Sequence, residues 1–287
     1  MRNRIQRLFM LLALLLPAYS HAAASKHVEP DATVATLQKL PVNAKHMLVL
    51  DESGHKVLMA KDADAVVPIA SLTKLMTAMV LLDARLDWKE KVRITNEDVD
   101  TLKHSRSFLR VGSEMPREAA LKFALMASEN RAAAALARTY PGGSNAFEQA
   151  LRAKIPSLGL THTTLSDPTG LSPANTSTAT EVAMIVAAAS RYPQIADITS
   201  DKKAKVIVNG KPRELHNTNH LVGSKGWDIR LSKTGYTDEA GRCLTMSMRS
   251  GGKNVTVVLL DADGSKQRIN DAMKIRTSLA KLPAHTL

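Results

Sequence analysis

Three short groups of residues have the types and spacing that covalent chemistry on an acyl group requires. Ser71 and Lys74 form an S-x-x-K string, Ser128 and Asn130 form an S-x-N string, and residues 233–235 read Lys-Thr-Gly. A serine hydroxyl becomes a strong nucleophile when a neighbouring group accepts its proton, and its attack on a carbonyl leaves an acyl-enzyme. The three strings together therefore predict an enzyme that forms a covalent intermediate on Ser71.

These strings are informative because they occur together and in this order. The S-x-x-K pattern occurs four times, beginning also at Ser53, Ser200 and Ser278, whereas chance predicts it about once in a chain of this length. The Lys-Thr-Gly string occurs once, against a chance expectation of about 0.05. Among the four serines, only Ser71 follows a proline and opens a long apolar helical pattern. Ser71 is therefore the predicted nucleophile.

Lys74 is the predicted base for Ser71. A step of three residues along a helix places both side chains on one face, and the positive end of the helix dipole favours negative charge at Ser71. An ordinary lysine is protonated at neutral pH and cannot accept a proton. Burial and a second cation, for which Lys233 is the candidate, would lower its pKa enough to let it do so.

The other two strings supply groups for the rest of such a reaction. The hydroxyl of Ser128 both donates and accepts, so it can pass a proton to a leaving amine, and the amide of Asn130 suits a peptide group. Lys233 and Thr234 offer a cation and a hydroxyl to a carboxylate. Gly235 lets a substrate backbone approach closely because it has no side chain.

Other chemistries find little support. His216 and His220 lie four residues apart, but no H-E-x-x-H string or Cys/His set accompanies them, and no phosphate-binding glycine string is present. The single cysteine, Cys243, lies on an expected strand and is interpreted as a packed thiol. The net charge of +12 favours polyanions such as cell-wall polymer, but an exported chain with 3% aromatic residues is a poor candidate for nucleic-acid binding. We expect no metal and no cofactor.

The first 24 residues have the composition of a secretory signal peptide. Three arginines precede the apolar run 8–16, and small residues around Ala22 and Ala24 supply a cleavage site. That run is much shorter than the ~20 residues a membrane span needs, so after cleavage we expect no transmembrane segment and a periplasmic protein. Residues 25–43 are polar, contain two prolines and are interpreted as a linker or N-terminal arm.

The remaining residues, 44–287, predict one catalytic domain of the α+β class. A hairpin around Ser53 and three C-terminal strands are expected to form one antiparallel five-stranded sheet, with the first and last helices covering it. The sheet part would comprise 44–85 and 220–287, and 86–219 would be a mostly helical part. The last helix is expected to bury Ile269, Met273 and Leu279. The expected helices include 116–126, 130–137 and one that begins at 178–181, and the expected strands are 231–233, 243–248 and 255–260.

Longer strings around these residues resemble the low-molecular-weight penicillin-binding proteins of serine DD-peptidase family S11. Within that family, the resemblance is to the D-alanyl-D-alanine endopeptidase type, the penicillin-binding protein 7 type. It covers roughly 44–282. The strings that carry it are Pro68–Val80, Ala127–Ala134, Pro168–Ser172, Asn217–Val222, Lys233–Thr237 and Ala240–Leu244.

The resemblance implies a fold, a substrate and a set of roles. The fold would be that of the DD-peptidases and β-lactamases, and the substrate the D-alanyl peptide of peptidoglycan. Ser71 would attack the carbonyl of a D-alanyl bond, the backbone amides of Ser71 and Tyr236 would form the oxyanion hole, and water would hydrolyse the acyl-enzyme. β-Lactam antibiotics would be covalent inhibitors, and other murein enzymes are possible partners.

Two features favour the endopeptidase among the related activities. Glu129 stands where the carboxypeptidase relatives have a glycine, and Arg131 follows it here. The sequence also stops without the further β domain and amphipathic anchor of those relatives. The expected reaction is hydrolysis of the D-Ala–diaminopimelate cross-link. A D-alanyl-D-alanine carboxypeptidase, a β-lactamase and a non-catalytic peptidoglycan-binding scaffold stay open as alternatives. A β-lactamase needs a base for deacylation, and the stretch after Asn130 offers only Asp167 before Pro168.

Overall fold

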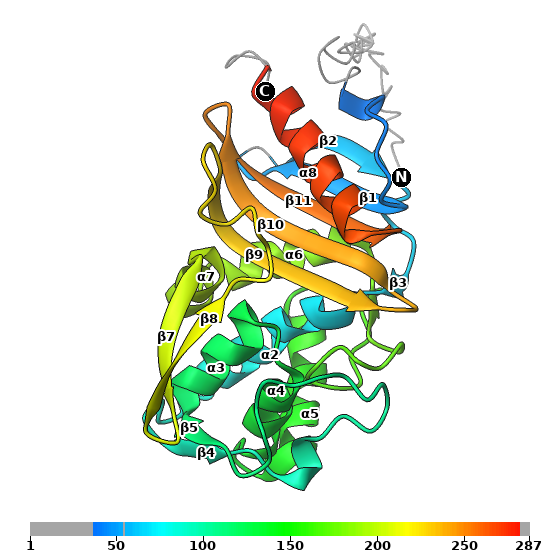
Figure 1. Ribbon diagram of the computed structural model, residues 1–287. Coiled ribbons are helices and arrows are strands. Elements are labelled where there is room, and N and C mark those ends of the chain that lie inside the picture. Colours follow the sequence, from blue (N-terminus) through cyan, green and yellow to red (C-terminus); the bar gives the residue numbers. More distant parts are fainter. Residues whose placement is uncertain (1–36, 54, 282–287) are drawn as a thin grey trace, which may run out of the picture. The chain divides into compact units, whose positions relative to one another are not determined.

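The computed structural model describes residues 37–53 and 55–281, in which one five-stranded sheet lies against a group of helices (Figure 1). The proposed signal peptide lies outside these residues. The strands are β1 His46–Asp51, β2 Lys56–Lys61, β3 Val67–Pro68, β4 Lys91–Arg93, β5 Glu114–Pro116, β6 Thr176–Ser177, β7 Lys203–Val208, β8 Lys211–His216, β9 Asp228–Thr237, β10 Gly241–Ser250 and β11 Lys253–Ala262. The helices are η1 Ala70–Thr73, α2 Lys74–Asp83, η2 Asn96–Asp98, α3 Arg117–Met126, α4 Asn130–Arg138, α5 Gly143–Ser157, α6 Ala179–Ala189, α7 Pro193–Ser200 and α8 Ser265–Leu279.

The main sheet joins the two ends of the domain. Its strand order is β2-β1-β11-β10-β9, and every pairing is antiparallel. The N-terminal strand β1 pairs along its whole length with the last strand, from His46 opposite Leu260 to Asp51 opposite Val255. The predicted α+β class and five-stranded antiparallel sheet are confirmed.

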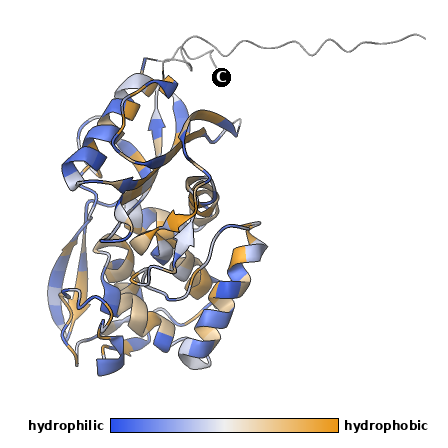
Figure 2. Ribbon diagram, turned by 90° about the vertical axis from the view of Figure 1, so that its right-hand side faces the viewer, coloured by the Kyte–Doolittle hydropathy of each residue, from blue (hydrophilic) through white to orange (hydrophobic). Residues whose placement is uncertain are grey.

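Both faces of the sheet are covered, which explains why its central strand β11 has a continuous apolar run at 257–260. Along β11, Val257 and Leu259 belong to the cluster under α8, whereas Val258 and Leu260 belong to the larger core on the other face. Alternate residues of a strand point to opposite faces, so a strand covered on both sides must be apolar at each position. Hydrophobic residues accordingly concentrate in the interior of the fold (Figure 2).

The last helix packs on the outer face, as predicted, but with a different apolar stripe. Ala272, Ile275 and Leu279 are buried against the sheet, whereas Met273 is half exposed. The prediction that Met273 is buried is therefore wrong, because the buried positions follow the 272–275–279 spacing of a helix and Met273 falls beside that stripe. Asp271 is also buried, and its carboxylate accepts the backbone N–H of Ala44, at 2.8 Å, just before β1.

The inner face is covered by a helix that the sequence analysis did not assign to it. We expected the first helix to lie there, but α6 packs on β1, β10 and β11, while α2 packs mainly against α3–α6. Residues 74–81 of α2 are all buried, and a helix that is buried on all sides lies inside a core rather than on its surface. The helix that begins at Lys74 is thus the central element of the helical part.

Residues 86–219 also contain strands, so their description as mostly helical was incomplete. β4 pairs with β5, and β7 pairs with β8 from Lys203 opposite His216 to Val208 opposite Lys211. The signal for the second hairpin was present at Asn209-Gly210, where both residues have positive φ, 50° and 72°. An Asn-Gly pair between two strands is a strong indicator of a tight hairpin turn.

Candidate active site

Ser71 lies in the short helix η1, immediately before α2, on a backbone that is tightly held. Ala70 has a φ of 46°, in the left-handed region that costs energy for a residue with a side chain. Its carbonyl accepts the hydroxyl of Thr73 at 2.8 Å, and Thr73 in turn accepts the side-chain N–H of Asn175 at 3.1 Å. Gly170 packs so closely that a Cβ there would lie 2.0 Å from the oxygen of Ala70. This packing fixes where the Ser71 hydroxyl points.

The amine of Lys74 lies at the centre of the site. Its Nζ is 2.8 Å from Ser71 Oγ, 2.8 Å from Asn130 Oδ1 and 2.7 Å from the carbonyl oxygen of Thr169. The side chain is buried. A neutral amine has two N–H donors and one lone pair. It can therefore donate to Asn130 and Thr169 while its lone pair faces the hydroxyl of Ser71.

Burial gives Lys74 the pKa that a base needs. Loss of solvation lowers its pKa from 10.5 to about 7, against the opposing pull of the Asp167 and Glu129 carboxylates. We expected Lys233 to contribute to this shift, but burial of Lys74 is its main cause. The pKa of Lys233 is lowered mainly by burial and, to a smaller extent, by repulsion from Lys74.

Ser128 and Lys233 form a second close pair. Lys233 Nζ donates to Ser128 Oγ at 2.8 Å and to the carbonyl of Thr234 at 2.9 Å. Ser128 lies between α3 and α4 with a φ of 56°. Burial lowers the pKa of Lys233 well below its usual value, with smaller contributions from Lys74 and Arg268. A carboxylate bound beside Lys233 would favour its charged form again.

Strand β9 forms the wall opposite α4. A Cβ on Gly235 would lie 3.0 Å from the oxygen of Ile69 and 3.2 Å from the nitrogen of Ser71, so this position allows β9 to approach η1. That approach brings the backbone of β9 at Gly235 next to the backbone of Ser71. Between the walls is a cavity of about 370 Å³, lined among others by Ser71, Ser128, Asn130, Thr218, Thr234 and Tyr236.

The structure brings the predicted site residues together and adds others that the sequence analysis missed. Ser105 accepts the side-chain N–H of Asn130 at 2.9 Å, and the hydroxyl of Thr218 lies 2.6 Å from that of Thr234. Arg242 and Arg268 also line the cavity. Thr218 lies in the quoted 217–222 string, whereas Ser105 belongs to a polar loop that carries no recognisable motif.

Asp167 stabilises the turn that contains Thr169, whose carbonyl accepts a hydrogen bond from Lys74. One carboxylate oxygen accepts the N–H groups of Thr169 at 2.6 Å and Gly170 at 2.8 Å, and the other accepts the N–H of Ser172 at 3.0 Å. A carboxylate that accepts several backbone N–H groups stabilises the loop around it. Asp167 is thus engaged by its own turn.

Three consecutive residues tie loop 99–113 to the site. The buried carboxylate of Glu129 accepts the hydroxyl of Ser107, Asn130 donates to Ser105, and Arg131 Nη1 donates to the carbonyl of Leu109 at 2.8 Å. On the opposite side, an ion pair between Lys103 and Glu239 joins this loop to the turn after β9. Glu129 and Arg131 therefore fix a wall of the cavity rather than entering it.

The site holds a serine beside a buried lysine amine, a second Ser–Lys pair and a Lys-Thr-Gly strand, all next to a five-stranded sheet. This combination is typical of serine acyl-transferring enzymes of the DD-peptidase class. The peptidase S11 family model, described as D-alanyl-D-alanine carboxypeptidase, matches residues 32–264. The chain belongs to this family and is a serine DD-peptidase.

Relatives and solved structures agree with this membership. The chain is 41% identical over 278 residues to a D-alanyl-D-alanine endopeptidase of Pseudomonas aeruginosa, covering 96% of this chain and 88% of that protein. It is 39% identical over 272 residues to one of Escherichia coli, covering 94% and 86%. The Streptomyces K15 DD-transpeptidase matches with a TM-score of 0.78 and 27% identity, over 85% of this chain and 99% of that one.

A structure with a bound antibiotic is also similar. Penicillin-binding protein D2 of Listeria monocytogenes, in its cefotaxime-bound form, matches with a TM-score of 0.75 and 28% identity over 84% of this chain and 99% of that one. Among the described residues, no helix has both the length and the apolar character that a membrane crossing requires.

Proposed function

We propose that Ser71 is the nucleophile and Lys74 its base. Ser71 Oγ attacks the carbonyl carbon of a D-alanyl peptide bond and gives its proton to Lys74 Nζ. The observation that carries this proposal is the buried Lys74 amine, 2.8 Å from Ser71 Oγ and with a pKa lowered to about 7. The backbone amides of Ser71 and Tyr236 would bind the oxyanion of the tetrahedral intermediate.

Ser128 and Lys233 serve the second half of acylation. When the intermediate collapses, the C–N bond breaks and the departing amine takes a proton from the Ser128 hydroxyl, which the Lys233 amine contacts. The proton that Lys74 took from Ser71 replaces the one that Ser128 gave, so Lys74 is neutral again in the acyl-enzyme. Asn130 binds the amide of the substrate, and Lys233 with Thr234 binds the carboxylate beside the scissile bond. Gly235 leaves room for the substrate backbone. Water then attacks the acyl carbon, releasing the peptide and restoring Ser71.

The substrate that we propose is the D-Ala–diaminopimelate cross-link of peptidoglycan. The two relatives at 41% and 39% identity are both named D-alanyl-D-alanine endopeptidases, and Glu129 followed by Arg131 holds the wall of the cavity here. A carboxypeptidase is the second candidate, because the family description and relatives such as the Bacillus subtilis protein, 29% identical, carry that name. Engagement of Asp167 by its own turn disfavours a β-lactamase.

Digestion of purified cross-linked muropeptide dimers tests this proposal. We expect mass spectrometry to show conversion of dimers to monomers, and we expect prior acylation with penicillin to block the conversion because it occupies Ser71. Intact dimers that have lost only a terminal D-Ala would overturn the endopeptidase and make the chain a carboxypeptidase. Unchanged dimers together with rapid turnover of penicillin would favour the β-lactamase.

We also propose that residues 1–24 are a signal peptide, that 25–43 are an arm, and that 44–287 are the catalytic domain of a periplasmic enzyme. The basic and then apolar composition of the first residues supports this. N-terminal sequencing of the protein recovered from the periplasm is expected to begin after Ala22 or Ala24. A start at Met1, or recovery only in the cytosol, would contradict it.

A further inference from the structure

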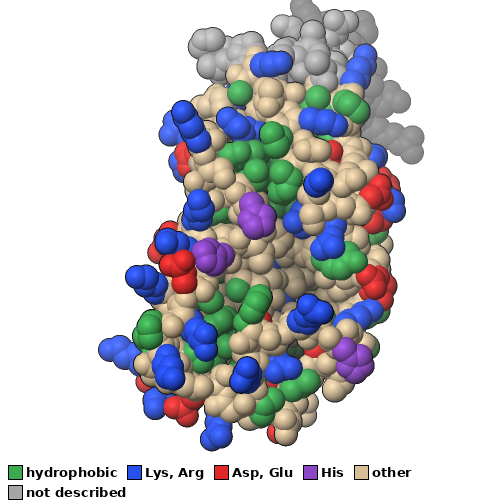
Figure 3. All heavy atoms as spheres, viewed as in Figure 1, with side chains coloured by type: hydrophobic (Ala, Val, Ile, Leu, Met, Phe, Trp, Pro, Cys, Tyr) green, Lys and Arg blue, Asp and Glu red, His purple; other side chains and the backbone are tan. Residues whose placement is uncertain are grey.

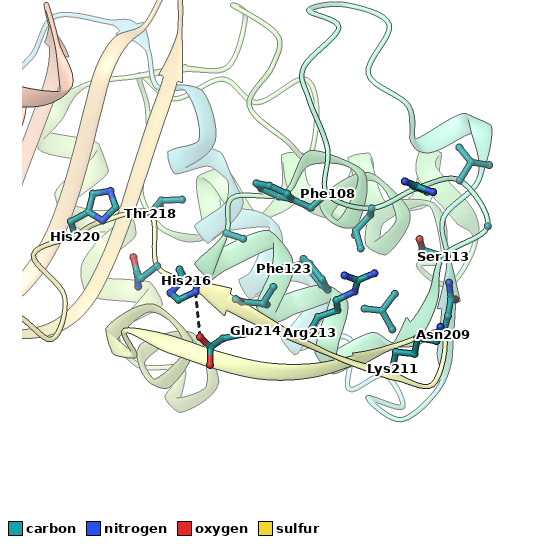
Figure 4. A pocket seen from close by; sticks show the side chains of 18 residues that line it. Phe108, Ser113, Phe123, Asn209, Lys211, Arg213, Glu214, His216, Thr218 and His220 are labelled. Atoms are coloured by element: carbon teal, nitrogen blue, oxygen red, sulfur yellow. Dashed lines mark ion pairs between the residues drawn. The ribbon is translucent and has the colours of Figure 1, made fainter.

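A groove much larger than the catalytic cavity lies between loop 99–113 and the β7–β8 hairpin. Its volume is about 1050 Å³, at the upper end of the roughly 300–1,000 Å³ typical of small-molecule sites. Figure 4 shows Phe108 on one side, strand β8 with Arg213 and Glu214 on the other, and Phe123 between them. Phe108 is 84% exposed, so its ring offers an apolar contact to anything that occupies the groove.

The groove is basic. Arg110, Lys211 and Arg213 line it, and Glu214 is its one acidic residue. Glu214 is already paired with Lys203 at 3.2 Å and with His216 at 3.4 Å. Within residues 55–281, the structure gives the guanidinium groups of Arg110 and Arg213 no hydrogen bond or ion pair. Basic side chains are scattered across this face, and acidic ones lie mostly toward its edges (Figure 3). The groove is therefore complementary to an anionic ligand.

The groove adjoins the catalytic cavity at the end where Thr218 and Thr234 lie. Thr218 and His220 line both spaces, and the Thr218 hydroxyl lies 2.6 Å from that of Thr234. Thr234 stands at the proposed carboxylate clamp, where Lys233 also contacts Ser128, the proposed donor to the leaving amine. The groove thus leads away from the end of the cavity that receives the departing part of the substrate.

We propose that this groove binds the stem peptide that departs when a cross-link is cut. The inference rests on the proposed endopeptidase activity. A carboxypeptidase releases one amino acid, which the 370 Å³ cavity can hold, whereas an endopeptidase releases a whole peptide with further free carboxylates. Arg110 and Arg213 bind those carboxylates from opposite sides, and Phe108 covers the peptide backbone. The groove therefore selects cross-linked over terminal D-alanyl bonds.

Charge reversal of one groove residue tests this assignment with two substrates. We expect Arg213→Glu to lower kcat/KM for muropeptide dimers by about tenfold, through KM, because an attraction becomes a repulsion of roughly 1.4 kcal/mol in total. The rate of covalent labelling by a fluorescent penicillin is expected to stay within about twofold of the wild type, because penicillin carries no departing stem peptide to occupy the groove. Arg110→Glu, on the opposite wall, is expected to behave in the same way.

Arg191→Glu is the matched control, since Arg191 is an exposed arginine in the turn after α6 that does not line the groove. It should leave both rates unchanged. Normal penicillin labelling by Arg213→Glu and Arg110→Glu shows that the variants are folded. If both variants then cut dimers as efficiently as the wild type, the groove assignment is overturned. If the wild-type enzyme labels normally but leaves dimers intact, the endopeptidase proposal fails and the groove assignment falls with it.

Discussion

Replacing Ser71 with alanine is expected to abolish both muropeptide cleavage and covalent labelling by penicillin. The hydroxyl oxygen is the only atom of Ser71 that can carry the acyl group, and loss of a catalytic serine costs on the order of 10⁶-fold in kcat. The fold should persist, because the backbone around Ser71 is fixed by Thr73 and Gly170 rather than by its own hydroxyl. Intact-protein mass spectrometry after incubation with penicillin measures the adduct, and a thermal melt measures the fold.

Ser265→Ala is the matched control for this experiment. Ser265 is the first residue of α8 and lines the same cavity, but it has no part in the proposed reaction. It should acquire the penicillin adduct at the wild-type rate. An adduct on the Ser71→Ala protein at the wild-type rate would mean that another residue is acylated, and the assignment of the nucleophile would be wrong.

Replacing Lys74 with methionine is expected to lower the rate of acylation by about 10²–10⁴-fold, the usual contribution of a general base. Methionine occupies a similar volume but cannot accept the Ser71 proton. The exposed Lys89, replaced in the same way, is the matched control and should have no effect. Stopped-flow labelling with a fluorescent penicillin measures both rates. Wild-type acylation by Lys74→Met would exclude Lys74 as the base.

The pH dependence of the wild-type rate follows from the same amine. Acylation needs neutral Lys74, whose pKa burial lowers to about 7. The rate should therefore rise about tenfold per pH unit below 7 and level off above it. A rate that keeps rising toward pH 10 would mean that Lys74 keeps its ordinary pKa.

The same shift makes the folded state more stable as the pH rises. Between about 7 and 10.5, the folded protein holds fewer protons at Lys74 than the unfolded chain does, so the contribution of this group to the free energy of unfolding rises with pH across that window. Below pH 7, both states are protonated and the full cost of the buried charge remains. Burying Lys74 thus gives it the pKa that the proposed base needs but lowers the free energy of unfolding.

Most of the fold could be predicted from the sequence because its elements have strong local signals. The apolar runs of β1, β10 and β11 and the helical spacing after Lys74 each indicate one kind of structure, and both are confirmed. Which helix covers which face could not be predicted in this way. α2 and α6 are both apolar over most of their length, and their places depend on packing between segments far apart in the chain.

The site residues also fall into those that local sequence signals predicted and those that only the folded chain brings together. The three strings predicted which residues gather around Ser71, because each string carries its chemistry in residue type and spacing. The residues that hold those strings in place carry no such signal. Ser105 and the Thr169 carbonyl contact Asn130 and Lys74 only after the chain has folded, and a backbone carbonyl has no signature in a sequence at all.

The pairing of β1 with β11 has a consequence for how the chain folds. His46 and Leu260 are neighbours in the sheet although more than two hundred residues separate them, and the large core on the inner face includes residues of both strands. Closing so long a loop costs entropy before any contact repays it, and folds with such distant contacts form slowly. A nascent chain that ends before Lys253 has no partner for β1 within the sheet beyond β2. The central sheet therefore cannot be completed until residues 253–262 have been synthesised, and until then β1–β2 and β9–β10 are separate two-stranded pieces.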